Sequence, residues 1–552
     1  MLLTPALGLT ALVFGAAMAI LVSYSAYTFR GGRLTEEVSF SAWGKFFGEP
    51  FYWGIVAETF RLGFGVTAVA LLIGFPTAYA LTKIRSQRLL LFAYIVIFSP
   101  LLVSVVVRAY GWLLLLSDGG VINETLLAVG VIETPIRMIF NQFGVTIALV
   151  HILLPFMVFP ILSVLLQFDA TLREAAMDLG ANRWQTFVRV ILPLSLPGML
   201  AGAQIVFTLA ISAFVTPSLL GGGRIQVLAR HIFVNVTDVN WPLAAVEAIV
   251  LLAMALAALA AFNIAGRAIQ ASRAAGAGRR QELPRRPDPI YAALYALLAL
   301  VLAYMLAPLV IVVINSFNES AFSRFPPTGW SLRWYETVLN YAPFRDGMRN
   351  SLLIAGLSTA IVVPVGMMAA LALVRSRIPL REVVRAFLLS PLIVPKVAVG
   401  IAVFILFIRL RVFGTMPSIV AAHAMLTLPF TIVLLTANLV GVNRTLEEAA
   451  MDLGAGPLRT FWKVTLPQMR AGLIVSAVFA FIVSFDETET TIFLVRPENT
   501  TLPIQMFLYI EQHQDPTLAA LSTVLIVITA VVVFLTMRAV RGAEVARIIS
   551  RR

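Results

Sequence analysis

Long apolar stretches, each about 20 residues or more, decide what this chain of 552 residues can fold into. A helix of roughly 20 residues crosses a hydrocarbon core of about 30 Å and satisfies its own backbone hydrogen bonds. Membrane-spanning strands would alternate in segments of about 10 residues, a pattern that the sequence lacks. We therefore expect an all-α polytopic membrane protein. Twelve transmembrane helices are predicted near residues 9–27, 56–82, 88–117, 141–166, 190–214, 242–264, 290–315, 350–374, 384–410, 418–440, 464–485 and 515–537.

The composition agrees with this class. The chain is 60% hydrophobic and 12% charged, whereas soluble domains carry about 25% charged residues. A net charge of +13 could indicate nucleic-acid binding, but the arginines lie mostly in short segments beside apolar runs, as the positive-inside rule predicts. Without cysteine, neither a disulfide nor a thiolate metal site is possible. The run 9–27 lacks a basic leader and is interpreted as a retained span.

Basic clusters indicate the orientation of the spans. They follow the second, eighth and last spans: Lys83, Arg85 and Arg88, then Arg375, Arg377, Arg381 and Arg385, and then the tail 538–552. All three lie on one side by parity, which the excess of Lys and Arg identifies as cytoplasmic. Both termini are then expected in the cytoplasm, together with a flexible basic linker at 265–289. This linker separates two six-helix halves, residues 1–264 and 290–552.

A repeat connects the two halves. The sequence Glu174-Ala-Ala-Met-Asp-Leu-Gly180 recurs 274 residues later as Glu448-Ala-Ala-Met-Asp-Leu-Gly454, and each copy is followed by Leu-Pro. Parity places both copies in the cytoplasm, and two parallel halves are expected to be related by an axis along the membrane normal. The translocation pathway would then lie between them. The sequence Ser99-Pro-Leu101 recurs as Ser390-Pro-Leu392, at an offset of 291 residues rather than 274. The first half therefore holds 17 additional residues after this point, which we assign to the outer segment 117–141.

Each copy of the repeat predicts two short helices. Thr171 with Glu174, and Thr445 with Glu448, have the spacing of a capping box that starts a helix. Gly180 and Gly454 can end these helices in a left-handed conformation. Second helices are expected to begin at Asn182 and Pro457. We call the resulting segments the first docking element (about 170–190) and the second docking element (about 444–464).

A glutamate at such a position can simply cap its helix. Capping alone, however, does not require Ala-Ala-Met-Asp-Leu-Gly and a later Leu-Pro to occur twice, and two small alanines permit close approach by a partner. The candidate docking residues are Glu174, Ala175, Ala176, Asp178 and Gly180, and Glu448, Ala449, Ala450, Asp452 and Gly454.

These motifs resemble the permease subunits of bacterial ABC importers, in which the Glu-Ala-Ala loop inserts a coupling helix into an ATPase subunit. The first half is similar to one spermidine/putrescine-type permease and the second half to its partner, so that the chain resembles a fusion of the two. The segments that carry this resemblance are 107–112, 154–156, 214–221, 330–335, 349–352 and 459–467. The resemblance implies two ATPase subunits inside the cell, a periplasmic or lipid-anchored solute-binding protein, and location in a bacterial inner membrane.

No nucleotide site is expected in the chain itself. A phosphate-binding loop needs Gly-x-x-x-x-Gly-Lys followed by Ser or Thr, and none of the four lysines stands in that context. The chain is therefore predicted to be a transport subunit without its own cofactor or catalytic residue, with ATP and Mg²⁺ bound by the partner ATPase subunits.

Ionisable groups at bilayer depth are expensive and mark a pathway or a paired site. Candidates for the substrate pathway are Arg108 with Tyr110 and Trp112, Lys396, Asp486 and Glu487, together with Phe214 and Thr216 from the resemblance. Two other interpretations stay open: Arg108 could extend to the outer interface, and the two acids could form an interfacial turn. No metal site is expected among the four histidines, and His151 and His423 are expected to be ordinary interior groups.

The cargo is expected to be a small polar solute, and the resemblance favours a polyamine or related amine. Such permeases are expected to have acids where Lys396 and Ala213 stand here. If Lys396 does not simply pair with Asp486, a zwitterionic or anionic solute is the alternative. A secondary transporter with two parallel six-helix repeats is the other rival, although it would not need duplicated docking elements.

Overall fold

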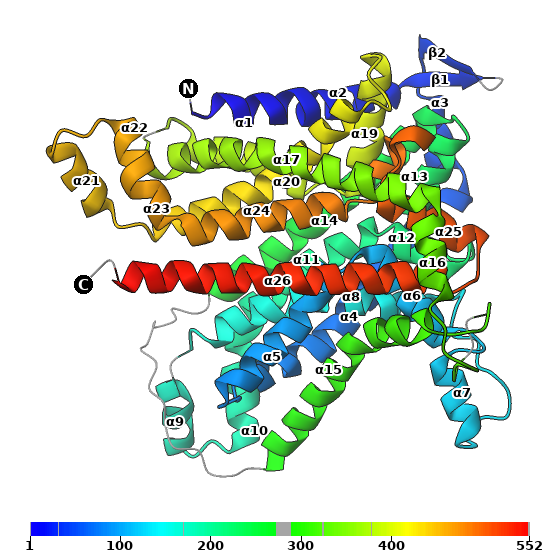
Figure 1. The fold of residues 1–552 in the computed structure, drawn as a ribbon, viewed down its shortest axis with the longest axis horizontal. Coiled ribbons are helices and arrows are strands. Elements are labelled where there is room, and N and C mark those ends of the chain that lie inside the picture. The colour runs from blue at the N-terminus through cyan, green and yellow to red at the C-terminus, as the bar shows by residue number, and fades with distance from the viewer. Residues whose placement is uncertain are drawn as a thin grey trace. The chain divides into compact units, whose positions relative to one another are not determined.

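The computed structural model describes residues 2–30, 33–168, 170–271, 289–322, 325–376 and 378–549. Within these ranges the regular secondary structure is helical apart from a two-stranded hairpin, β1 (Tyr27–Arg30) and β2 (Arg33–Val38), and an isolated bridge (Figure 1). The all-α prediction is therefore confirmed, although the hairpin was not expected. The chain divides into two compact units, which are described one at a time.

Unit 2 comprises Ser41–Trp334 and Ile510–Ser522. Its core consists of three packed helices, α4, α8 and α11. Small residues permit their close approach, because Gly74 and Gly202 both lie against the buried side chain of Met157. The helices of this unit are α3 (Ser41–Gly48), α4 (Pro50–Leu81), α5 (Gln87–Phe98), α6 (Val105–Leu116), α7 (Val121–Ala128), α8 (Gln142–Leu165), α9 (Ala170–Asp178), α10 (Arg183–Thr186), α11 (Leu192–Ser212), α12 (Val215–Gly221), α13 (Leu228–Thr237), α14 (Trp241–Ala271) and α15 (Pro289–Ser316).

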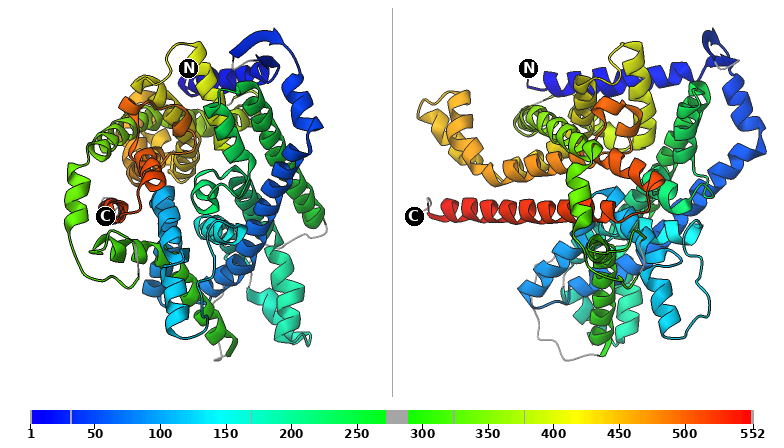
Figure 2. Two further views of the ribbon diagram at one scale, coloured as in Figure 1. Left: turned by 90° about the vertical axis from the view of Figure 1, so that its right-hand side faces the viewer. Right: turned by 45° about the vertical axis from the view of Figure 1, so that its right-hand side comes forward.

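Unit 1 comprises Met1–Phe40, Tyr335–Tyr509 and Thr523–Arg552. Its core repeats the arrangement of unit 2, with α17, α20 and α24 packed together, and Figure 2 shows these helices from two further sides. The helices of this unit are α1 (Thr4–Leu9), α2 (Ala16–Tyr24), α16 (Arg333–Asn340), α17 (Ala342–Arg375), α18 (Arg381–Leu389), α19 (Lys396–Arg409), α20 (Met416–Val440), α21 (Arg444–Asp452), α22 (Pro457–Thr460), α23 (Leu466–Gln468), α24 (Arg470–Phe485), α25 (Leu502–Gln512) and α26 (Thr517–Ile549). Of these, α16, α25 and α26 each cross a unit boundary.

The first helix of each half packs in the unit formed mainly by the other half. In unit 1, α1 and α2 lie against α17, α19 and α20. In unit 2, α15 packs against α6 and α4, where Gly111 has no side chain and so admits the backbone of Pro308. Tyr304 adds a hydrogen bond from its hydroxyl to the carbonyl of Ile147 at 2.6 Å.

Ten helices among the described residues are long and apolar enough to cross a membrane, or up to twelve if each of two bent pairs counts as one span. The expected number is thus reached only with the bent pairs. The predicted span 384–410 consists of two helices at 94°, and the predicted span 464–485 belongs to a pair bent by 77° next to Met469. The predicted span 88–117 is also interrupted, by a turn at Ser99–Leu102. Prolines explain two of these interruptions, because neither Pro100 in the turn Ser99–Leu102 nor Pro395 in the break between Leu392 and Lys396 can donate a backbone hydrogen bond.

The 17 additional residues of the first half lie where the sequence placed them. They include α7, and the buried side chain of Asn123 holds the segment together. Its amide donates to the carbonyls of Ser117 and Ile136 and accepts from the Ile136 N–H at 2.8 Å. The linker was expected to begin at residue 265, but helix α14 continues to Ala271. The linker residues 272–288 lie outside the described part of the chain.

Candidate functional site

Both docking elements form a pair of short helices, α9 with α10 and α21 with α22 (Figure 1). The predicted capping boxes are wrong. Thr445 lies inside α21, whose cap is Asn443; the Oδ1 atom of this residue accepts a hydrogen bond from the Thr445 N–H at 3.0 Å. Thr171 likewise lies inside α9, which begins at Ala170. An asparagine two residues upstream of Thr445 caps a helix as well as threonine does.

The other local predictions are confirmed. Gly180 and Gly454 have φ angles of +86° and +84° and end the first helix of each element. The next residue closes the turn in the same way in both copies: the N–H groups of Ala181 and Ala455 donate to carbonyls five residues back, each at 3.0 Å. Asn182 caps α10 with a complete capping box, and Pro457 is the first residue of α22.

A wider helical turn follows at the same place in both copies. Residues Phe187–Ile191 and Phe461–Thr465 adopt the π-helical form directly before the repeated Leu-Pro. Proline cannot donate to the preceding turn, and one added residue in that turn accommodates the lost hydrogen bond. The repeat therefore conserves a backbone distortion as well as residues.

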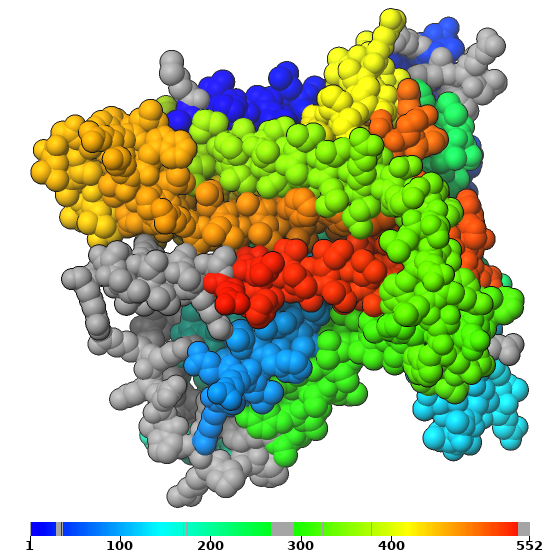
Figure 3. Space-filling view, viewed as in Figure 1, coloured from blue at the N-terminus to red at the C-terminus, as the bar shows by residue number. Residues whose placement is uncertain are grey.

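The candidate docking residues lie on exposed surface. Leu179 and Leu453, at equivalent positions, are each 89% exposed. Ala175, Asp178, Glu448, Ala449 and Asp452 are exposed, Ala176 and Ala450 are half-buried, and the Glu174 side chain lies outside the described part. Glu448 makes a surface ion pair with Arg444 at 3.0 Å. In Figure 3 the second docking element is the orange segment that projects beyond the neighbouring helices of unit 1.

The intramembrane candidates of the second half come together. Lys396 begins α19, and its Nζ donates to Glu487 Oε2 at 2.7 Å. Glu487 is 3% exposed and accepts a second hydrogen bond from the Thr490 N–H at 3.0 Å. The lysine thus pairs with Glu487, whereas the sequence suggested Asp486. Asp486 and Glu489 still lie close enough to act electrostatically on the lysine.

The candidates of the first half are buried in unit 2. Arg108, Tyr110 and Trp112 on α6 are only 4–6% exposed, so Arg108 does not extend to a polar interface. Its Nε instead donates to the carbonyl of Ser104 at 3.3 Å. Phe214 and Thr216 are each 1% exposed around the start of α12. None of these residues lines either of the two cavities described below.

Two histidines are interior groups, as predicted. His423 Nδ1 lies 2.9 Å from Ser484 Oγ, and its Nε2 lies 2.8 Å from Thr491 Oγ1. His151 Nε2 lies 3.1 Å from the carbonyl of Met305. Across the described ranges, no group of three or more His, Asp and Glu side chains could hold a metal ion.

Two buried acids were not predicted from the sequence. Glu247 is fully buried on α14, where its oxygens lie 2.5 Å from His231 Nδ1 and 2.9 Å from Asn235 Nδ2. An isolated acid within the apolar run 242–264 was the available signal. Glu447, directly before the repeated Glu-Ala-Ala, is also buried; no sequence pattern distinguishes it from an exposed helical glutamate.

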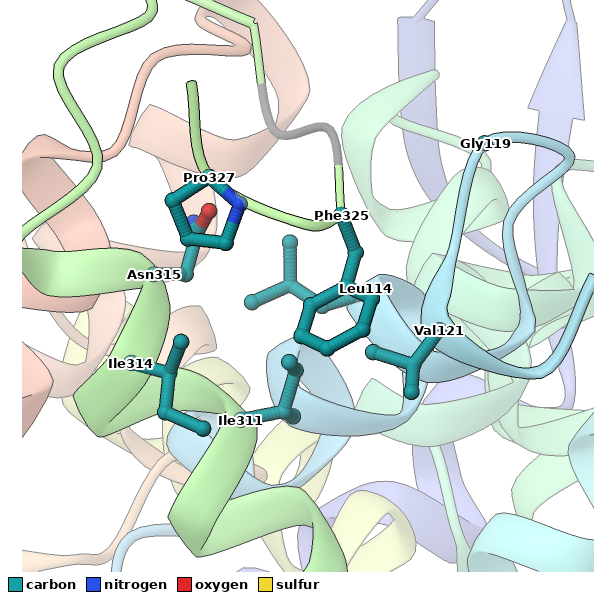
Figure 4. Close-up of a pocket in the computed structure, with 8 residues that line it drawn as sticks. All are labelled: Leu114, Gly119, Val121, Ile311, Ile314, Asn315, Phe325 and Pro327. Atoms are coloured by element: carbon teal, nitrogen blue, oxygen red, sulfur yellow. The ribbon is translucent and has the colours of Figure 1, made fainter. Parts of the chain in front are cut away.

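Each of the two units contains a cavity. One, of about 10 Å³, lies between α6, α7, α15 and the segment after α15 in unit 2. Figure 4 shows the side chains of Leu114, Ile311 and Phe325 directed into it, and its volume is room for about one water molecule. The other, of about 870 Å³, lies in unit 1 between α17 and the second docking element. The first is too small for an organic cargo.

Comparison with known proteins adds independent information. The family model of the "binding-protein-dependent transport system inner membrane component" matches residues 70–272 and 362–544. The chain is 39% identical over 208 residues to the spermidine/putrescine transport system permease protein PotB of Escherichia coli (strain K12), covering 37% of this chain and 74% of that protein. It is 31% identical over 259 residues to the putrescine transport system permease protein PotI of the same organism, covering 46% and 92%.

A similar solved structure is that of a bacterial ABC transporter involved in the import of the acidic polysaccharide alginate. The two structures have a TM-score of 0.37 and 18% sequence identity, and the alignment covers 47% of this chain and 91% of the other chain.

Proposed function

Because the chain belongs to the family of binding-protein-dependent transport system inner membrane components, we propose that it forms the complete translocation pathway of an ATP-driven importer. The family model matches both halves, and most of each single permease corresponds to less than half of this chain. One polypeptide would therefore supply what two permease subunits supply elsewhere. Family membership leaves no support for the secondary-transporter alternative.

The duplicated, exposed docking elements carry this proposal. Each presents an equivalent leucine, Leu179 or Leu453, that is 89% exposed beside small alanines. Exposed apolar residues on a repeated element mark a protein-binding surface. Two ATPase subunits bind there, one at each element, and hold the ATP and Mg²⁺. Both elements and both termini then lie in the cytoplasm, and the solute-binding protein docks on the opposite face of the inner membrane.

A polyamine or related small amine is the proposed cargo. The relatives named above are spermidine/putrescine and putrescine permeases. Around Lys396, the three carboxylates of Asp486, Glu487 and Glu489 outnumber the single ammonium group, so the segment stays acidic despite the lysine. An acidic surrounding favours a cation.

A zwitterionic solute is the second candidate, because Lys396 supplies a positive group directly beside these acids. An anionic solute would face the same excess of carboxylates. The two remaining classes, amine and zwitterion, are distinguished by transport competition.

The decisive experiment is reconstitution. The chain is purified with any ATPase and solute-binding protein that are encoded beside its gene, and it is placed in liposomes loaded with ATP. We expect ATP-dependent uptake of labelled putrescine or spermidine and no hydrolysis by the chain alone. Uptake without nucleotide, or failure of any ATPase to copurify, would contradict the importer assignment. Preferential competition by amino acids would replace the amine with a zwitterion.

A further inference from the structure

We propose that Glu447 is the positioning residue through which the second docking element moves the membrane helices. The inference rests on the proposed function, since it assigns a mechanical role within an ATPase-docking element. It concerns the residue directly before the repeated Glu-Ala-Ala, which belongs to neither the motif nor its exposed surface.

Glu447 points inward while most of its helix is exposed. It is 8% exposed, whereas its neighbours Leu446 and Glu448 are exposed. The hydroxyl of Thr465 donates to its Oε1 at 2.8 Å. Arg375 Nε lies 3.1 Å from its Oε2 in an ion pair. One carboxylate therefore holds two separate elements.

Those two elements lead into the core of unit 1. Arg375 is the last residue of α17, and Thr465 ends the π-helical turn that leads through α23 to α24. Both α17 and α24 belong to the three packed core helices. A displacement of α21 is thus transmitted to two membrane helices by the same side chain.

Direct packing between α21 and α17 is sparse, and the cavity of about 870 Å³ lies between α17 and the docking element. Arg375, Glu447 and Thr465 all line this cavity. Hydrogen bonds to charged groups are about twice as strong as neutral ones. The carboxylate consequently connects α21 to α17, two helices that pack sparsely against each other, while α21 also packs directly against the π-helical turn that ends at Thr465.

The link is specific to the second half. At the offset of 274 residues, the position of Glu447 is occupied by Arg173 in the first half. The two docking elements present similar surfaces to a partner but cannot share this carboxylate link. The halves should therefore respond unequally to equivalent substitutions.

The test compares solute uptake per ATP hydrolysed in the reconstituted complex. Glu447→Gln removes the charge without changing size, and we expect ATPase copurification to persist while uptake per ATP falls about tenfold, the effect of losing one charge-assisted contact. The exposed Glu382, which faces Arg385 at 4.0 Å, provides the control variant Glu382→Gln, with expected uptake per ATP within about twofold of the wild type.

Two further comparisons separate positioning from folding. Thr465→Val removes the hydroxyl donor and should lower uptake per ATP, whereas Thr465→Ser keeps it and should not. The exchange Arg375→Glu with Glu447→Arg preserves an ion pair, and the Thr465 hydroxyl can accept as well as donate, so uptake should recover relative to Glu447→Gln.

Two outcomes would overturn the inference. Unchanged uptake per ATP in Glu447→Gln would remove its role in transmission. Loss of the ATPase from purified Glu447→Gln, with a wild-type melting temperature, would make Glu447 a docking contact. Failure of the docking assignment is distinguishable, because the wild-type chain itself would then copurify without an ATPase.

Discussion

Lys396 Nζ lies 2.7 Å from Glu487 Oε2, which ties the first residue of α19 to the loop that follows α24. The same loop is held by the Thr490 hydroxyl, which donates to the Lys396 carbonyl at 3.1 Å. Gly400 permits this approach, because a Cβ atom there would lie 2.6 Å from the Phe493 ring. A charge pair inside a predicted span is therefore part of a tightly packed connection between two elements of unit 1.

Breaking this pair should destabilise the protein. Glu487→Ala leaves the ammonium group and the Thr490 N–H without their acceptor, at a cost of about 1–3 kcal/mol. The melting temperature of the purified protein should fall, and the double variant with Lys396→Ala should fall by less than the sum of the single effects. The exposed Glu498→Ala is the control. Additive effects in the double variant would show that the pair is not coupled.

If Lys396 lies on the pathway, it should influence whether cationic or zwitterionic solutes are transported preferentially. Lys396→Glu adds a fourth carboxylate to the acidic segment around it, and we expect the uptake ratio of polyamine to zwitterionic solute to rise about tenfold. Lys396→Arg keeps the charge and should leave the ratio near that of the wild type. An unchanged ratio in Lys396→Glu would remove this residue from the pathway.

Reversing the charge of both motif glutamates should abolish transport. Glu174→Lys with Glu448→Lys alters both proposed docking surfaces, while the exposed ion pair of Glu448 with Arg444 contributes only about 0–1 kcal/mol to stability. The variant should therefore remain in the membrane at the wild-type amount. Uptake and membrane content are measured together, with Glu382→Lys as control; continued uptake at normal expression would disprove the coupling role.

The buried cluster around Glu247 should contribute to stability. Glu247→Ala removes the shared acceptor of His231 and Asn235 and leaves these side chains their contact with each other at 3.1 Å, at a cost of about 1–3 kcal/mol for an unsatisfied buried group. Glu247→Gln retains an acceptor and should lower the melting temperature less. The exposed Asp238→Asn at the end of the neighbouring α13 is the matched control. Equal effects of Ala and Gln would mean that hydrogen bonding is not the cause.

Gly111 tests the packing of α15 in unit 2. A Cβ atom there would lie 2.5 Å from the Pro308 carbonyl oxygen, so Gly111→Val should lower the melting temperature strongly, with overpacking worth about 1–3 kcal/mol. Gly65→Ala lies in open space on α4 and should be neutral or slightly stabilising. Similar melting temperatures for the two variants would contradict this packing.

Predictions of helix ends from sequence were correct where the backbone conformation depends only on residues nearby in the sequence. The glycine ends at Gly180 and Gly454 and the helix starts at Asn182 and Pro457 follow from backbone geometry, and the structure confirms them. The cap assigned to Thr445 was wrong because Asn443 competes for the same helix end. The bend at Met469 could not be predicted, because the break itself contains neither proline nor glycine.

By itself, the sequence determined the helical membrane class of the fold and the two repeated pairs of short helices, because bilayer thickness and the repeat act through composition and spacing alone. Tertiary structure decided which charged side chains meet. Lys396 forms its ion pair with Glu487 rather than with Asp486. The side chain of Glu447 is buried, whereas that of the next residue, Glu448, is exposed. Such pairings depend on the rotation and packing of helices distant in sequence, and these follow from the whole set of contacts rather than from any local pattern.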